Sequence, residues 1–306
     1  MKRLSGGFSL VELMMSLVIL TVILGGVVAL LSSSMQTNTR TELRSDMYEN
    51  VRGVAEMMSQ EIGQSGLVSL PPSTLTSAAA LGAQTVNVSS TTSMFVGEQV
   101  LVDAGNSEES VTLTAVTPTS ITATFSKPHL LGAPINALGV FPTGIVPNVP
   151  VAGTVPINAP ELSTPNVLNL YGDINADGSL VYVRYTCTPG TSAAPGTLTR
   201  SVTTIVPGAN KISANQTLLT TVVGGVGAAC FQYTTQTAAG FTFVTNVGFT
   251  LSVQATSPDP QTGAYATMTK SFLNLAPRNI LAGLELAQAG GSANRLQQTP
   301  ANVAAY

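Results

Sequence analysis

Charged residues are scarce in this sequence: Asp, Glu, Lys and Arg together make up 9% of its 306 residues. There are 12 basic and 15 acidic side chains, and Lys2 and Arg3 occupy two of the basic positions at the N-terminus. Binding to nucleic acid through its phosphates requires clustered positive charge, which this composition does not supply. Because 44% of the residues are hydrophobic, the chain can still bury a core. We therefore expect a folded protein without a nucleic-acid partner.

Residue types that carry out catalysis are also few. His129 is the only histidine, and we expect it to be structural or solvated in a turn. Glu108 and Glu109 are adjacent, but neighbouring side chains on a strand point to opposite faces. Acid-base and nucleophilic catalysis need a base beside a nucleophile, or carboxylates that share a pocket. The sequence therefore predicts a protein that is not an enzyme.

Cysteine is limited to Cys187 and Cys230. Their spacing fits neither a C-x-x-C redox pair nor a zinc site. If this region lies outside the cytoplasm, a disulfide is permitted, and closing a loop of this length would stabilise the fold by about 4 kcal/mol. Two buried free thiols are the alternative.

One long segment, in contrast, has almost no charge. From Phe8 to Leu31 the only ionisable residue is Glu12, and a helix of this length spans about 36 Å, enough to cross a bilayer. Lys2 and Arg3 precede it, so we expect a single pass with the N-terminus cytoplasmic and the rest periplasmic. A secretory signal peptide would instead need a cleavage site of small residues after the apolar segment, which Ser32 to Ser34 match only loosely.

The carboxylate of Glu12 needs a reason to be in a membrane segment, where it costs about 2.5 to 3.5 kcal/mol. The surrounding residues, Gly6-Gly7-Phe8-Ser9-Leu10-Val11-Glu12-Leu13, resemble the prepilin processing motif of type IV pilins and type II secretion pseudopilins. The resemblance implies that residues 1–7 are a leader, cleaved by prepilin peptidase between Gly7 and Phe8. It also implies N-methylation of Phe8 and pairing of Glu12 with the N-terminal amine of a neighbouring subunit. The alternative is an ordinary anchor in which Glu12 snorkels to the cytoplasmic surface.

Residues 32–66 are predicted to continue the helix as an amphipathic segment. Its apolar stripe, which should pack against a sheet, consists of Leu43, Met47, Val51, Val54, Met58 and Ile62. Gly63, Gly66 and Pro71-Pro72 supply the signals that end it.

After Pro72 the pattern alternates as in strands, with Gly, Pro and Asn between them. We predict an inserted small all-β module over 78–138, a Pro-rich connection over 139–166, a pilin-like β-sheet domain over 167–282 and a flexible tail over 283–306. The fold class is therefore α+β, with a long N-terminal helix packed on an antiparallel β-sheet head. The order of these elements resembles PilW-like minor pilins and, more loosely, the J-type minor pseudopilin.

Asp173, Asn175, Asp177 and Gly178 match the start of an EF-hand calcium loop, but Arg184 occupies the position of the bidentate Glu. A full EF-hand is thereby excluded. Two interpretations stay open: a calcium site built from Asp173, Asn175 and Asp177, or a hairpin turn at Asp177-Gly178 without metal. No other cofactor is expected.

Taken together, the resemblance implies a minor pilin, a structural subunit that enters a type IV pilus after leader cleavage and N-methylation. Its implied partners are prepilin peptidase, other major and minor pilin subunits, the inner-membrane assembly platform and membrane lipid. It would move from the bacterial inner membrane to the pilus or cell surface. Two alternatives stay open: a minor pseudopilin of a type II secretion system, and a single-pass surface adhesin or binding module.

Overall fold

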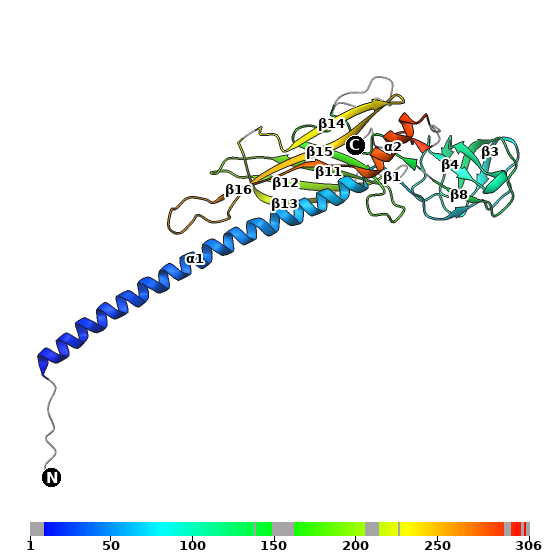
Figure 1. The fold of residues 1–306 in the computed structure, drawn as a ribbon. Helices are drawn as coiled ribbons and strands as arrows, with labels where there is room; N and C mark the ends of the chain where they lie inside the picture. The colour runs from blue at the N-terminus through cyan, green and yellow to red at the C-terminus, as the bar shows by residue number, and fades with distance from the viewer. Residues whose placement is uncertain are drawn as a thin grey trace, which may run out of the picture.

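The computed structural model describes residues 9–137, 139–148, 162–205, 214–225, 227–290, 295–300 and 303. A single long helix carries an elongated β-rich body at its C-terminal end (Figure 1). A second, smaller group of strands lies at the end of this body farthest from the start of the helix (Figure 1). The α+β class predicted from the sequence is confirmed.

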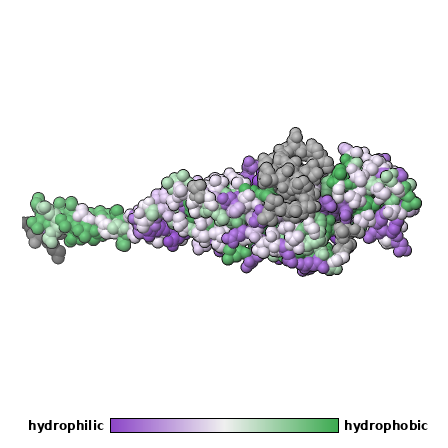
Figure 2. All heavy atoms as spheres, turned by 90° about the horizontal axis from the view of Figure 1, so that it is seen from above, coloured by the Kyte–Doolittle hydropathy of each residue, from purple (hydrophilic) through white to green (hydrophobic). Residues whose placement is uncertain are grey.

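Helix α1 runs without interruption through Leu10–Gln64, a length of 55 residues. Its N-terminal part is apolar enough to cross a membrane, and none of the side chains in its most hydrophobic stretch is buried. Figure 2 shows this free end as a predominantly hydrophobic surface. The predicted stripe on the second half is confirmed: the buried residues are Met47, Val51, Val54, Ala55, Met58, Glu61 and Ile62. The helix therefore has one half without protein cover and one half docked on the body.

The end of α1 is fixed by Gly66, whose φ of +80° is a left-handed conformation that favours glycine. A Cβ atom at this position would lie 2.8 Å from Ile280 Cγ1 and 2.9 Å from the carbonyl oxygen of Phe141. The chain then enters β1 (Leu67–Val68), which pairs with β9 (Gly139–Val140). A side chain at position 66 would therefore require Ile280 or the backbone at Phe141 to shift.

The head is a seven-stranded antiparallel sheet. Its strands are β10 (Val167–Gly172), β11 (Val181–Thr188), β12 (Gly196–Thr204), β13 (Ala214–Val223), β14 (Phe231–Ala238), β15 (Phe241–Gln254) and β16 (Thr267–Leu275). The order is β10-β11-β12-β13-β15-β14, and β16 pairs with β15. Val253 of β15 pairs with both Val222 and Met268, so β13 and β16 flank β15 on opposite sides. The buried stripe of α1 and the short helix α2 (Arg278–Gln288) share one hydrophobic core with this sheet.

Cys187 of β11 and Cys230, just before β14, form a disulfide with a Cα–Cα distance of 6.4 Å. The predicted pairing is therefore present in the structure. Both residues are buried in the head core. The bond ties two strands that the sheet order keeps apart.

The inserted module has its own core, separate from that of the head. One sheet has the order β2-β8-β4-β5 and the other β3-β7-β6. The strands are β2 (Ser73–Thr74), β3 (Gly82–Asn87), β4 (Gln99–Val102), β5 (Glu109–Thr112), β6 (Ala115–Val116), β7 (Ser120–Phe125) and β8 (Pro134–Asn136), with a 3-10 helix η1 (Gly105–Ser107). These elements lie close to the range predicted for the module.

The C-terminal region differs from the flexible tail expected from residue 283 onward. Helix α2 extends to Gln288, and Leu296, Gln297 and Val303 are buried. Gln297 joins the module to the rest of the chain: its Oε1 accepts from the Gln99 amide at 2.9 Å, and its Nε2 donates to the Gln99 carbonyl at 2.8 Å. The low complexity of the tail sequence concealed a few apolar residues that pack between head and module.

Candidate functional site

The cleavage-site residues Gly7 and Phe8 lie outside the described residues, but Glu12 is in the first turn of α1. The Ser9 amide donates to Glu12 Oε2 at 3.1 Å. A carboxylate here is also favoured by the positive end of the helix dipole. The carboxylate of Glu12 therefore turns back to the residue that precedes the helix, Ser9.

The side chains around Glu12 are apolar and without protein cover. Leu10, Val11 and Leu13 are 76%, 63% and 56% exposed. Exposed apolar side chains continue along this part of the helix as far as Leu31 and Met35. A surface this apolar requires lipid or other helices around it.

The comparisons with known proteins bear on this end of the chain. The family described as the prokaryotic N-terminal methylation motif matches residues 2–28. This chain carries an N-terminal methylation motif. The match covers Gly7, Phe8 and Glu12, and it implies processing by prepilin peptidase and partners of the pilin type in general. Searches of curated proteins and of solved structures each found no match.

The motif also accounts for the apolar half of α1. A methylation motif followed by an exposed apolar helix fits a membrane anchor. It leaves the head unassigned, because no residue after 28 is matched.

A buried ionic network joins the second half of α1 to the head. Glu61 lies on the buried face of the helix, and its Oε2 accepts from the Tyr185 hydroxyl at 2.5 Å and from Arg200 Nε at 3.3 Å. A second bond joins Arg200 Nη2 to Glu61 Oε1. Burial raises the pKa of Tyr185, and the nearby Glu61 carboxylate raises it further. Sequence reasoning missed this network, because Glu61 and Arg200 are 139 residues apart.

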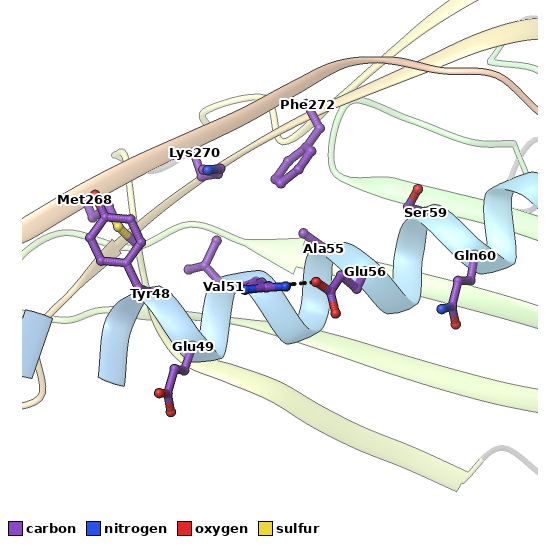
Figure 3. Close-up of a pocket in the computed structure, with 11 residues that line it drawn as sticks. Tyr48, Glu49, Val51, Ala55, Glu56, Ser59, Gln60, Met268, Lys270 and Phe272 are labelled. Carbon is purple, nitrogen blue, oxygen red and sulfur yellow. Dashed lines mark hydrogen bonds and ion pairs between the residues drawn. The ribbon is translucent and has the colours of Figure 1, made fainter. Parts of the chain in front are cut away.

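A groove of about 740 Å³ lies beside α1, between the helix and β16. Met268, Lys270 and Phe272 extend from β16 toward the helix (Figure 3). Arg52 and Glu56 pair across one helical turn, with Arg52 Nε 2.7 Å from Glu56 Oε1. The residues that line the groove include neither histidine nor cysteine. They are Tyr48, Glu49, Val51, Arg52, Ala55, Glu56, Ser59, Gln60, Met268, Lys270 and Phe272. The lining combines apolar side chains with the Arg52–Glu56 ion pair and the Lys270 ammonium.

The residues of the calcium interpretation form a turn between β10 and β11. Asp173 is buried, and its carboxylate accepts from the amides of Asp177 and Gly178, each at 3.0 Å, and from the Ser69 hydroxyl. Asn175 and Asp177 are exposed. Within the described part of the chain, no three His, Cys, Asp or Glu side chains are grouped as metal ligands. These contacts favour the hairpin interpretation, and calcium binding stays a prediction.

Replacing Asp173 with alanine separates the two interpretations. If the carboxylate serves the turn, the variant should lose about 1 to 3 kcal/mol of stability whether or not calcium is present, since buried amides lose their acceptor. Urea unfolding with calcium and with a chelator measures this, and Asn175→Ala provides an exposed control from the same loop. Stabilisation of the wild type by calcium that disappears in Asp173→Ala would favour the cation.

Glu98 is a buried acid in the module that the sequence did not single out. Its side chain is fully buried, Oε2 accepts from the Phe95 amide at 3.2 Å, and Oε1 has no partner among the described residues. Burial raises the pKa of Glu98 from 4.5 to about 8, although the Phe95 amide opposes the shift. Burial therefore favours the neutral form of Glu98 in the folded module.

This acid makes stability depend on pH in a defined window. Between pH 4.5 and about 8 the folded chain keeps a proton that the unfolded chain has released. Stability should therefore fall as pH rises through this window, by about 1.4 kcal/mol per pH unit. Glu98→Gln, which keeps the neutral shape, should remove this slope in urea unfolding followed by tyrosine fluorescence. An unchanged slope in the variant would show that Glu98 titrates normally.

Proposed function

We propose that this chain is a minor pilin, a subunit built into a type IV pilus after removal of residues 1–7 and N-methylation of Phe8. The observation that carries the proposal is the methylation motif with Glu12 in the first turn of an exposed apolar helix. The continuous α1 and the β-rich head support it.

The driving force for assembly follows from the charges at the mature N-terminus. Cleavage after Gly7 creates an amine on Phe8, four residues before the carboxylate of Glu12. In hydrocarbon each of these charges is costly alone, and pairing with the opposite charge of a neighbour relieves both. A growing filament offers such a neighbour at its end, so the two buried charges favour addition of subunits.

The inserted module supports the role of a minor subunit rather than that of the major subunit of the pilus shaft. It lies at the end of the body remote from the apolar part of α1, and it adds a second core beyond that of the head (Figure 1). A subunit with such an extension is bulky for a densely packed shaft, so it suits a subunit that occupies few positions. A minor pseudopilin of a type II secretion system shares the same N-terminal chemistry and is the second candidate.

Mass spectrometry of the protein from cells tests the processing step. The expected N-terminal peptide begins at Phe8 and carries an added methyl group on its amine. Cells that lack prepilin peptidase are the control, and there the chain should begin at Met1 or Lys2. An intact leader in cells with active peptidase would refute the proposal. If the leader is removed, recovery of this chain in sheared pili would favour the type IV pilus over the type II secretion system.

A further inference from the structure

The loop that joins β15 to β16, residues 255–266, reaches back along the apolar part of α1. Figure 1 shows it extending from the body toward the N-terminal half of the helix. A hollow of about 340 Å³ lies between this loop and α1. The loop contributes Pro260 to its lining, and α1 contributes the rest: Val28, Leu31, Ser32, Met35, Gln36 and Thr39. A part of the head therefore lies beside α1 well before the buried stripe begins at Met47.

One ion pair fastens the β15–β16 loop to the helix. Arg40 Nη2 lies 2.8 Å from Asp259 Oδ1, and Arg40 Nε donates to the same oxygen at 2.9 Å. The loop is also closed by its own backbone. The Asp259 amide donates to the Ala264 carbonyl and the Gly263 amide donates to the Asp259 carbonyl, each at 2.8 Å. Pro260 is thus held at a defined place beside α1.

The hollow lies where α1 would leave a bilayer. The apolar stretch that could cross the membrane ends at Leu31, and Met35, one turn later, is 68% exposed. The hydrocarbon core of a bilayer is about 30 Å thick, and the headgroup layers add about 5 to 8 Å on each side. Four helical residues rise about 6 Å, so a helix whose apolar stretch fills the core carries Leu31 at its edge and Met35 within the headgroup layer. Pro260 lines the same hollow as both residues, and it therefore lies at this depth.

We propose that the β15–β16 loop is a second membrane contact of this protein, in which Pro260 and its neighbours lie among phospholipid headgroups. Lipid is the occupant because the hollow is continuous with the apolar stretch. Val28 and Leu31 belong to that stretch and are 63% and 56% exposed, so the lipid that covers them extends over the hollow that they line. The inference rests on the membrane anchor and does not depend on a role in a pilus.

The composition of the loop suits the headgroup layer. Asp259 is its only charged residue, and the bond to Arg40 lowers the pKa of this carboxyl. The ionised carboxylate therefore reaches the headgroups already paired with a cation. Tyr265 is 43% exposed, and tyrosine is enriched where a membrane meets water. Ser257 and Thr262 are exposed and carry hydroxyl groups that can donate to lipid phosphate oxygens.

A second contact fixes the orientation of the head on the membrane. A helix alone can turn about its axis in the bilayer, whereas a loop fastened to one side of α1 meets the headgroups at one rotation and one tilt. β15 has 14 residues and is about 46 Å long, and it leads from this loop away from the apolar part of α1 (Figure 1). The turn between β14 and β15, at Ala239 and Gly240, therefore lies remote from the lipid.

Spin labelling of the full chain in vesicles tests this contact. Both cysteines are in the disulfide, so an introduced cysteine is a unique site for the label. One variant is Gln261→Cys, next to Pro260, and the matched control is Ala239→Cys at the other end of β15; both positions are exposed. The vesicles are phosphatidylcholine with a small fraction of a lipid whose headgroup chelates nickel. Paramagnetic nickel accelerates the relaxation of a spin label that it encounters, so the relaxation rate reports contact with headgroups.

We expect the nickel lipid to increase the relaxation rate in Gln261→Cys several-fold more than in Ala239→Cys. Adding Arg40→Gln to Gln261→Cys should lower this increase toward the Ala239→Cys value, because the loop loses its bond to α1. Arg44→Gln removes an exposed cation from the same helix and should leave the increase unchanged.

Equal relaxation rates at the two labelled positions overturn the proposal. So does spin–spin broadening in Gln261→Cys that disappears on dilution with unlabelled chain, because a second copy would then cover the hollow. An increase that Arg40→Gln leaves unchanged overturns the role of the ion pair. Leader cleavage and recovery in pili do not enter this measurement, so its failure is distinct from a failure of the minor-pilin proposal.

Discussion

Replacing Glu12 with alanine should abolish incorporation of this chain into filaments while leaving it in the membrane. The wild-type carboxylate costs about 2.5 to 3.5 kcal/mol within a bilayer, so its removal should improve insertion. Its partner in a filament would be the Phe8 amine of the next subunit, and without Glu12 that amine stays buried and unpaired. Breaking one side of a buried ion pair costs about 3 to 5 kcal/mol, enough to reduce subunit addition by more than about a hundredfold.

The measurement is the amount of the chain in sheared pili relative to the membrane fraction. Glu42→Ala is the matched control, because Glu42 is an exposed carboxylate on the same helix beyond the apolar part. It should assemble as the wild type does. Equal incorporation of Glu12→Ala and wild type would mean that α1 is an ordinary anchor and that the carboxylate snorkels.

The helical part of the fold could be predicted because its signals are local. The apolar stretch, the stripe at steps of three and four, and the glycine at the end of α1 each act over a few residues. The same holds for the second half of β15, where Phe249, Leu251 and Val253 alternate with more polar neighbours. The methylation motif is likewise contiguous, so the sequence alone identifies the residues around Glu12.

Two strands of the head sheet, β10 and β13, could not be predicted from the sequence, for a physical reason. β10 is buried on both faces, so its sequence does not alternate between apolar and polar residues. The pairing of β13 with β12 is irregular around Leu198. In the sequence of β13, two adjacent leucines and two adjacent valines interrupt the alternation of apolar and polar residues. Alternation of apolar and polar residues indicates a strand only when one face of the sheet is exposed to solvent and the strand pairing is regular.

The contacts of several charged side chains in the body could not be predicted, because their partners are distant in sequence. Glu61 is a single acid within an otherwise apolar face of α1, and Asp103, Glu109 and His129 come from three different segments of the module. A short stretch of sequence around each of these residues would predict a side chain exposed on the surface. Their roles follow from strand pairing, which brings them together only in the folded chain.

The second large effect concerns the joint between α1 and the head. Replacing Arg200 with methionine should destabilise the protein by about 3 to 5 kcal/mol, because the Glu61 carboxylate stays buried with Tyr185 as its remaining described partner. Arg52→Met removes the same type of partner from Glu56, where the two side chains are 78% and 59% exposed. That control should cost less than about 1 kcal/mol, since water replaces the lost partner.

A double variant, Glu61→Leu with Arg200→Met, distinguishes a lost interaction from a damaged site. It removes both charges and leaves apolar side chains of similar volume, so it should recover most of the stability lost in Arg200→Met. Urea unfolding of the full chain in detergent, followed by tyrosine fluorescence, measures all three variants. If the double variant is as unstable as Arg200→Met, the loss comes from packing rather than from an unpaired charge. If it recovers, the buried carboxylate is neutralised chiefly by Arg200, and this ion pair couples the membrane helix to the sheet.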